Sequence, residues 1–358
     1  MSGGGMTRYN AKDRVKAAFR RTFADRVPSY PILGAYTVNL TGGSLRDYFT
    51  KARPLAEGQL AALDAYEPDV LVVMRDLLAE AEALGSEVRV PDRGFPFIVR
   101  HVLAEEPEKL ARLSPPDVRN AGRFPEYWEA CRIVAGQAGD VPVGSILVGP
   151  WTIAANVRGV ENLLRDTRRR PAFVRDLLEL TARVALDAGM AAREVGVGVS
   201  YSEPAASCSL ISPAIYREFV QPVHQRLVTA LREKKIAVTL HVCGYLDPIL
   251  DEVLDTGIAA LSIDSATSLE TAVNVNRGRA VLIGNVSVSA FETGTPADVE
   301  AEVRRAVDIA AGNGAFILAS ACEIPPTARR ENVAHFARYA KEYGRYENLG
   351  IRAENKGE

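Results

Sequence analysis

The chain has 358 residues, of which 47% are hydrophobic and 25% charged, the composition of an ordinary globular protein. Its net charge of −2 forces no basic surface, so nucleic acid is not an expected partner. No segment approaches the roughly 18 apolar residues that a membrane span requires, and the N-terminus lacks the form of a signal peptide. With four cysteines and no such signal, we expect a cytoplasmic protein whose cysteines serve packing, catalysis or metal binding.

Eight short segments are predicted as strands. The second of them is a continuous apolar run, as is typical of a parallel strand that is buried on both faces. After it, the irregular stretch 87–103 predicts a β excursion. The predicted strands cover residues 27–35, 69–74, 141–148, 197–202, 236–243, 257–264, 280–285 and 315–320.

Helical spacing separates these strands. Ser212-Pro213 and Thr295-Pro296 are helix start signals, with a hydroxyl residue as N-cap and proline at the first helical position. The alternation predicts parallel strands joined by right-handed crossovers, and eight such units close a (β/α)8 TIM barrel. The alternative, an open doubly wound sheet, lacks its glycine-rich phosphate loop. The predicted helices cover residues 8–24, 54–66, 115–137, 171–195, 212–235, 295–311 and 330–343.

We therefore expect one barrel domain over 1–358, with an N-terminal extension at 1–24 and a loose tail at 348–358. The fifth strand carries the most informative residues. Side chains alternate along a strand, so Thr239, His241 and Cys243 share one face while Val238, Leu240 and Val242 share the other. In a barrel the apolar face packs on the outer helices. His241 and Cys243 then point into the lumen at the carboxyl end of the strand, where barrel enzymes carry their chemistry.

An imidazole and a thiolate side by side make half of a tetrahedral zinc site. The best candidate for a third ligand is Cys322, just after the eighth strand. The fifth and eighth strands of a closed barrel lie roughly across the lumen, so ligands at their ends can meet over its mouth. Three protein ligands leave one open position, which is the mark of a catalytic zinc. Cys131 and Cys208 have no such pattern and are expected to serve packing.

Glu203, at the end of the fourth strand, has three interpretations: it caps the turn before Pro204, serves as a displaceable zinc ligand, or acts as a general base. Asp264 and Asn285 end the sixth and seventh strands and are candidates to hydrogen-bond the substrate or the zinc ligands. Tyr36 and Trp151 are candidates to line the pocket.

The chain also resembles the uroporphyrinogen decarboxylase superfamily, and more closely its branch of zinc-dependent, corrinoid-linked methyltransferases. This branch includes enzymes of the methylcobamide:coenzyme M methyltransferase type and the methyltransferases of O-demethylases. The resemblance covers nearly the whole chain, and its most specific part is the His-x-Cys pair with the distal cysteine. The segments that carry it are 80–85, 149–152, 212–222, 241–244, 284–286, 322–326 and 331–332.

The resemblance implies zinc bound by His241, Cys243 and Cys322. It further implies methyl transfer between a small-molecule donor or thiol acceptor and the cobalt of a separate corrinoid protein, which docks over the barrel mouth. A homodimer is also considered. Decarboxylation of a porphyrinogen is the first alternative. Asp69 resembles the decarboxylase aspartate that binds pyrrole nitrogens, but residues 30–37 lack the arginines that clamp a substrate with many carboxylates. The second alternative is a non-catalytic barrel that binds a corrinoid protein.

Overall fold

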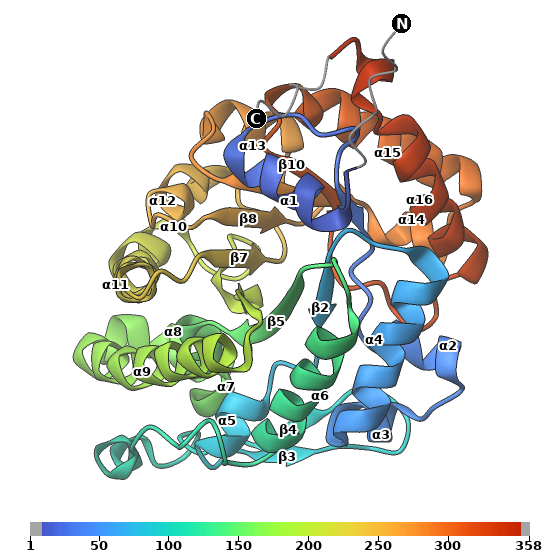
Figure 1. The fold of residues 1–358 in the computed structure, drawn as a ribbon. Coiled ribbons are helices and arrows are strands. Elements are labelled where there is room, and N and C mark those ends of the chain that lie inside the picture. The colour runs from blue at the N-terminus through green and yellow to red at the C-terminus, as the bar shows by residue number, and fades with distance from the viewer. Residues whose placement is uncertain (1–8, 352–358) are drawn as a thin grey trace, which may run out of the picture.

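The computed structural model describes residues 9–351 and contains an eight-stranded sheet in which every paired neighbour is parallel. The order β1-β10-β9-β8-β7-β6-β5-β2 follows the chain around a barrel, which confirms the predicted fold (Figure 1). Its strands are β1 (Ser29–Tyr30), β2 (Leu71–Val73), β5 (Val143–Val148), β6 (Gly198–Ser202), β7 (Val238–Val242), β8 (Ala260–Ile263), β9 (Val281–Val286) and β10 (Phe316–Ser320).

The barrel is nearly closed, and Asp69 bridges its seam between β1 and β2. The backbone nitrogen of Asp69 donates to the carbonyl oxygen of Ser29 at 2.9 Å, and the Asp69 carboxylate accepts from the nitrogen of Ser29 at 2.8 Å. Arg26 and Arg14 pair with the same buried carboxylate at 2.6 and 3.1 Å. Because Ser29 starts β1 and Asp69 precedes β2, this network lies at the amino ends of the strands.

Helices surround the strands, as Figure 1 shows. The predicted last helix has the observed bounds of α16, and Thr295 caps α15 as expected. The helices are α1 (Ala11–Arg20), α2 (Val38–Thr41), α3 (Leu45–Thr50), α4 (Ala52–Tyr66), α5 (Ala79–Ala83), α6 (Phe124–Gln137), α7 (Pro150–Arg158), α8 (Val160–Arg169), α9 (Pro171–Val195), α10 (Pro213–Ile215), α11 (Gln221–Glu233), α12 (Leu250–Leu254), α13 (Leu269–Asn276), α14 (Val288–Glu292), α15 (Pro296–Ala310) and α16 (Arg330–Tyr343).

The β excursion predicted after the second strand is an antiparallel hairpin of β3 (Glu87–Arg89) and β4 (Phe97–Arg100). Tyr346–Leu349 forms a 3-10 helix that includes residues 348 and 349 of the predicted tail, and Tyr346 is buried. Residues 1–8 of the predicted extension and 352–358 of the predicted tail lie outside the described residues. Over residues 9–351, the helices are all too short or too polar to cross a lipid bilayer.

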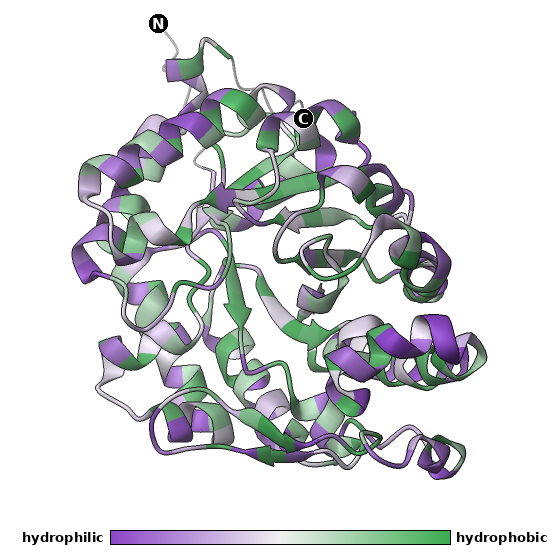
Figure 2. Ribbon diagram, turned by 180° about the vertical axis from the view of Figure 1, so that it is seen from behind, coloured by the Kyte–Doolittle hydropathy of each residue, from purple (hydrophilic) through white to green (hydrophobic). Residues whose placement is uncertain are grey.

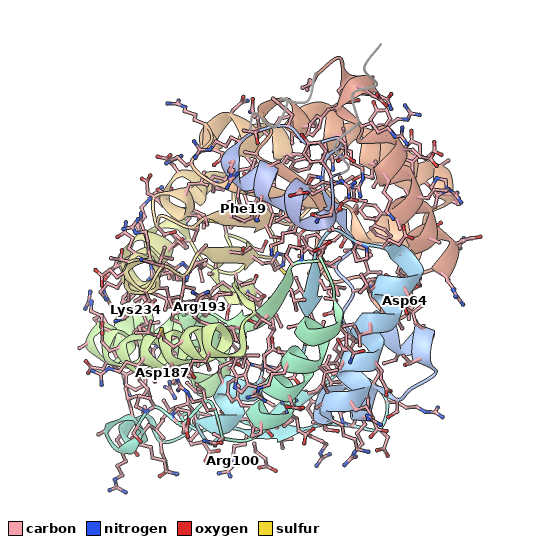
Figure 3. The ribbon with its side chains drawn as sticks, viewed as in Figure 1. Phe19, Asp64, Arg100, Asp187, Arg193 and Lys234 are labelled. Carbon is pink, nitrogen blue, oxygen red and sulfur yellow. The ribbon has the colours of Figure 1, made fainter. Side chains whose placement is uncertain are left out.

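The hydrophobic core lies between the strands and the inward faces of the helices. Hydrophobic residues concentrate there, whereas hydrophilic residues cover the outward faces (Figure 2). Exposed charged side chains such as Arg100, Arg193 and Lys234 lie at the periphery (Figure 3). Along β7 the outward residues Val238, Leu240 and Val242 are buried in this core, so the alternation that the sequence predicts is the one observed.

Candidate metal centre

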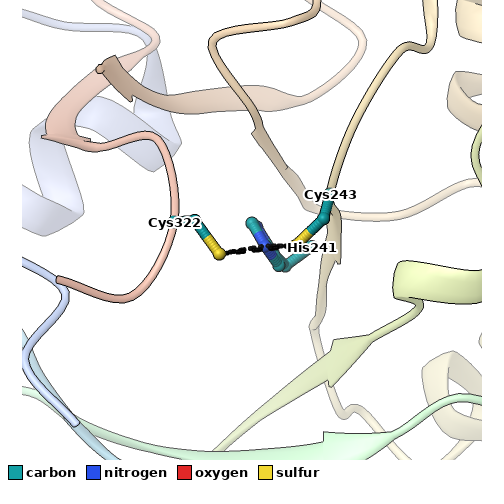
Figure 4. A group of neighbouring side chains, drawn as sticks. All are labelled: His241, Cys243 and Cys322. Atoms are coloured by element: carbon teal, nitrogen blue, oxygen red, sulfur yellow. Dashed lines mark hydrogen bonds between the residues drawn. The ribbon is translucent and has the colours of Figure 1, made fainter. Parts of the chain in front are cut away.

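Three potential metal ligands meet at the carboxyl ends of β7 and β10. His241 lies on β7, Cys243 follows that strand, and Cys322 follows β10 (Figure 4). His241 Nε2 is 2.9 Å from Cys243 Sγ and 3.8 Å from Cys322 Sγ, and the two sulfur atoms are 3.4 Å apart. All three ligand atoms lie within 4.8 Å of one another. The structure thus brings together the three residues that the sequence selects.

The spacing of these atoms fits a zinc ion. With Zn–S bonds of about 2.3 Å, Zn–N bonds of about 2.0 Å and tetrahedral angles, ligand atoms lie roughly 3.6 to 3.8 Å apart. Two of the three observed separations fall within about 0.4 Å of that range, and a small rotation of the imidazole would lengthen the third. Two soft sulfurs with one imidazole are also the donor set that zinc prefers. His241, Cys243 and Cys322 could therefore hold a metal ion with one position left open.

Ser262 orients the imidazole of His241. Its hydroxyl oxygen lies 2.9 Å from His241 Nδ1, and Ser262 is buried on β8, the neighbour of β7. With a metal at Nε2, the ring proton would be on Nδ1, and Nδ1 would donate a hydrogen bond to this oxygen. Such a partner fixes both the tautomer and the orientation of a histidine ligand.

The two thiols are coupled through their contact. The hydrogen bond with Cys243 lowers the pKa of Cys322, and the nearby His241 lowers it further, whereas the same hydrogen bond and burial raise the pKa of Cys243. Metal binding requires thiolates, so loading the site would release the protons that the two thiols carry.

The three residues open into a cavity of about 280 Å³ at the barrel mouth. Three charged residues that the sequence reasoning missed also line it: Arg75 and Asp76 after β2, and Glu323 next to Cys322. Burial raises the pKa of Glu323 to about 7, although Ala35 donates its backbone N–H to the carboxylate at 2.7 Å. The position of Arg75 and Asp76 directly after a predicted strand was the signal that could have identified them.

Glu203 is fully buried and does not line this cavity. Its carboxylate accepts hydrogen bonds from the backbone nitrogens of Trp151 and Thr152, at 3.0 and 2.8 Å, and lies 2.9 Å from His224 Nε2. It thus satisfies the free N–H groups at the start of α7. The structure does not place Glu203 where a fourth zinc ligand or a general base would stand, because both of its oxygens are engaged elsewhere. Its histidine partner, His224, is a buried residue of α11.

Three further candidates are also absent from the cavity wall. The hydroxyl of Tyr36 lies 3.1 Å from that of Tyr66, and Trp151 donates its indole N–H to the carbonyl of Ala205 at 2.9 Å. Both rings pack in the core instead of lining the pocket. Asp69 lies at the amino ends of the strands, far along the barrel axis from the mouth, and its carboxylate is neutralised by arginines.

Asp264 and Asn285 build the loop after β8. Asp264 Oδ1 accepts from the backbone nitrogen of Ala266 at 3.0 Å, and its charge lies close enough to raise the pKa of Cys243. Asn285 donates to the carbonyl oxygens of Asp264 and Thr267, each at 3.2 Å. Neither residue lines the cavity, so they support the loop beside the metal centre.

The family model described as uroporphyrinogen decarboxylase (URO-D) matches residues 10–343 of the chain. Among curated proteins, methylcobamide:CoM methyltransferase MtbA of Methanosarcina acetivorans is 27% identical over 351 residues, covering 94% of this chain and 99% of the relative. A methylated-thiol–coenzyme M methyltransferase of Methanosarcina mazei is 27% identical over 271 residues, or 75% of this chain and 71% of the relative.

Uroporphyrinogen decarboxylases are also similar. The one from Paraburkholderia phytofirmans is 26% identical over 296 residues, which is 75% of this chain and 77% of that protein. Among solved structures, a methyltransferase from Methanosarcina mazei superposes with a TM-score of 0.85 at 24% identity, covering 94% of this chain and 99% of that one. At this identity the superposition shows the shared barrel fold.

Proposed function

Because the chain belongs to the uroporphyrinogen decarboxylase family, we propose that it is a methyltransferase of that family that uses zinc bound by His241, Cys243 and Cys322. It moves a methyl group between a small molecule and the cobalt of a corrinoid protein docked over the barrel mouth. The observation that carries the proposal is the convergence of one imidazole and two thiols at the open end of the cavity. The relatives named as methylcobamide:CoM methyltransferases support the corrinoid partner.

When bound, zinc would supply a Lewis acid that holds the sulfur or oxygen atom to which the methyl group is attached or transferred. The chain's own residues prepare that position. Ser262 holds Nδ1 of His241 at 2.9 Å, which directs Nε2 toward the two sulfurs. The barrel wall surrounds the three ligands on the lumen side, and the cavity that they line would be where the small molecule binds.

The cavity does not favour porphyrinogen decarboxylation. A substrate with many carboxylates requires several free cations, because unpaired buried charges are costly. Among the described residues that line the cavity, the only arginine or lysine is Arg75, which already pairs with Glu80 at 2.7 Å. Asp69, the proposed counterpart of a pyrrole-binding aspartate, lies at the other end of the barrel.

A cytoplasmic location and a homodimer stay predictions.

Metal analysis tests the zinc site. We expect about one zinc per chain in the purified protein, and loss of that zinc in Cys243→Ala and in Cys322→Ala. Cys208→Ala is the matched control, because Cys208 is also a partly buried free cysteine but lies outside the triad. Full zinc in both triad variants would contradict the proposed site.

A methyl-donor screen tests the reaction. Purified protein, a Co(I) corrinoid protein and candidate methyl compounds are mixed, and formation of methyl–cobalt is followed by absorbance. We expect a spectral change that requires the zinc-loaded protein and is lost in Cys322→Ala. Corrinoid binding without any spectral change would favour the non-catalytic barrel, and consumption of a porphyrinogen without metal would favour the decarboxylase.

A further inference from the structure

Beyond the three metal ligands, much of the cavity wall is apolar. Ile32, Met74 and Ile146 line it from the barrel interior, and Phe49 and Phe95 line it near the β3–β4 hairpin. The two phenylalanine rings are 5.4 Å apart between centroids and tilted by 52°. An apolar cavity of about 150 Å³ already holds one benzene molecule. The present cavity of about 280 Å³ therefore has room for a single substituted ring.

The guanidinium of Arg75 is not free to bind an anion. Its Nη2 donates to Glu80 at 2.7 Å and its Nη1 to the carbonyl oxygen of Asp76 at 3.0 Å. Its Nε has no hydrogen-bond partner but is buried, and the guanidinium lies over the rings of Phe124 and Tyr127 at 4.9 and 4.8 Å. Arg75 thus contributes part of the wall with a side chain that is only 3% exposed and whose positive charge already pairs with Glu80.

The two carboxyl groups of the wall offer no partner to an anion. Asp76 is paired with Arg123, whose Nη1 and Nη2 contact both of its oxygens. Glu323 has a hydrogen bond to the backbone of Ala35 but forms no ion pair among the described residues. A sulfonate or carboxylate on the ligand would find the guanidinium groups of Arg75 and Arg123 already paired with carboxylates of the protein.

We infer that the molecule whose methyl group is exchanged is uncharged and carries a flat apolar ring, and that Phe95 selects it. The inference rests on the proposed function only for the methyl group; the ring and the absence of charge follow from the wall. Phe95 lines the cavity from the turn between β3 and β4, yet it is 47% exposed. Its ring is thus positioned to cover a bound ring at the rim, with Phe49 packed behind it.

Calorimetry with three matched probes tests the charge preference. The probes are 4-methylanisole, 4-methoxybenzenesulfonate and 4-methoxybenzylammonium, which share the methoxybenzene part and differ in the charge of one substituent. We expect 4-methylanisole to bind at least tenfold more tightly than either charged probe. A smaller difference, tighter binding of a charged probe, or no binding of 4-methylanisole would overturn the inference.

Substitutions in the hairpin test the role of Phe95. Phe97 is the matched control, because it is also 47% exposed and lies two residues away but does not line the cavity. We expect Phe95→Ala to weaken binding of 4-methylanisole about three- to tenfold, as loss of one aromatic contact does, and Phe97→Ala to leave it unchanged. Phe95→Lys should strengthen binding of the sulfonate probe, whereas Phe97→Lys should not. Equal effects at the two positions would refute the selection by Phe95.

These measurements separate the two proposals. Calorimetry detects the ring in the cavity without any corrinoid and without methyl transfer. Binding of 4-methylanisole with no methyl–cobalt formed from any donor would sink the methyltransferase reaction and leave the ring inference standing. Methyl transfer from an anionic donor at the same rate as from a neutral one would refute the inference of an uncharged substrate and leave the methyltransferase reaction standing.

Discussion

The hydrogen bond between Ser262 and His241 yields the sharpest prediction about the metal centre. Replacing Ser262 by alanine removes the only side-chain partner that the structure shows for Nδ1 of His241 among the described residues. Ser262 has only 3% of its surface exposed, at the edge of the cavity that His241 also lines. The variant keeps all three ligand atoms and changes only how firmly the imidazole is oriented.

The size of the effect follows from two estimates. An unsatisfied buried donor costs about 1–3 kcal/mol. Loss of a partner to a metal-bound histidine lowers metal affinity about 10- to 100-fold, which corresponds to roughly 1.4–2.7 kcal/mol. The two ranges agree, so we expect Ser262→Ala to weaken zinc binding by one to two orders of magnitude while the protein remains folded.

Competition with a chromophoric chelator measures this affinity directly. Ser200→Ala is the control, because Ser200 also lines the cavity with a hydroxyl residue but lies on β6 and is not the residue that contacts His241 Nδ1. It should bind zinc as the unchanged protein does. Zinc affinity within twofold of the unchanged protein in Ser262→Ala, or an equal loss in both variants, would refute the view that this hydroxyl orients the ligand.

Three further outcomes are expected. Gly149→Ala should lower the free energy of unfolding by about 1–3 kcal/mol, because its new Cβ would lie 2.3 Å from the fixed carboxylate of Glu203. Gly136→Ala on α6 is the control, since there is open space at its Cβ, and it should be neutral or slightly stabilising. Urea unfolding compares the two variants, and equal stabilities would contradict the predicted clash. Asp69→Asn should lower the free energy of unfolding by about 3 kcal/mol, because it weakens the buried ion pair with Arg26, and it should leave the zinc content unchanged. Asp92→Asn breaks an exposed ion pair and should lower the free energy of unfolding too little to resolve. Loss of zinc in Asp69→Asn would contradict a purely structural role for Asp69. Removal of zinc by a chelator should lower the melting temperature, because zinc at 100 times its dissociation constant adds about 2.7 kcal/mol; an unchanged melting temperature would speak against binding to the native state.

Much of the metal centre could be predicted from the sequence because its signals are local. Alternation along a strand placed His241 and Cys243 on one face and pointed that face into the barrel. The order of strands and helices then implied a closed barrel, and closure brought Cys322 to the other two. The same alternation put Ser262 on the inward face of the sixth strand, so its position, although not its contact, was open to prediction.

The tertiary structure decided which polar residues have partners. Glu203 ends a strand, as catalytic residues of barrels do, and Asp69 resembles a substrate-binding aspartate of the family, yet Glu203 serves the start of α7 and Asp69 closes the seam at the opposite end. Such roles depend on backbone groups and charges distant in the sequence, which no local pattern records. The cavity wall is decided in the same way: Phe95 reaches the pocket from a hairpin only because that hairpin folds against α3. The sequence by itself determined where the ligands are; packing alone determined what surrounds them.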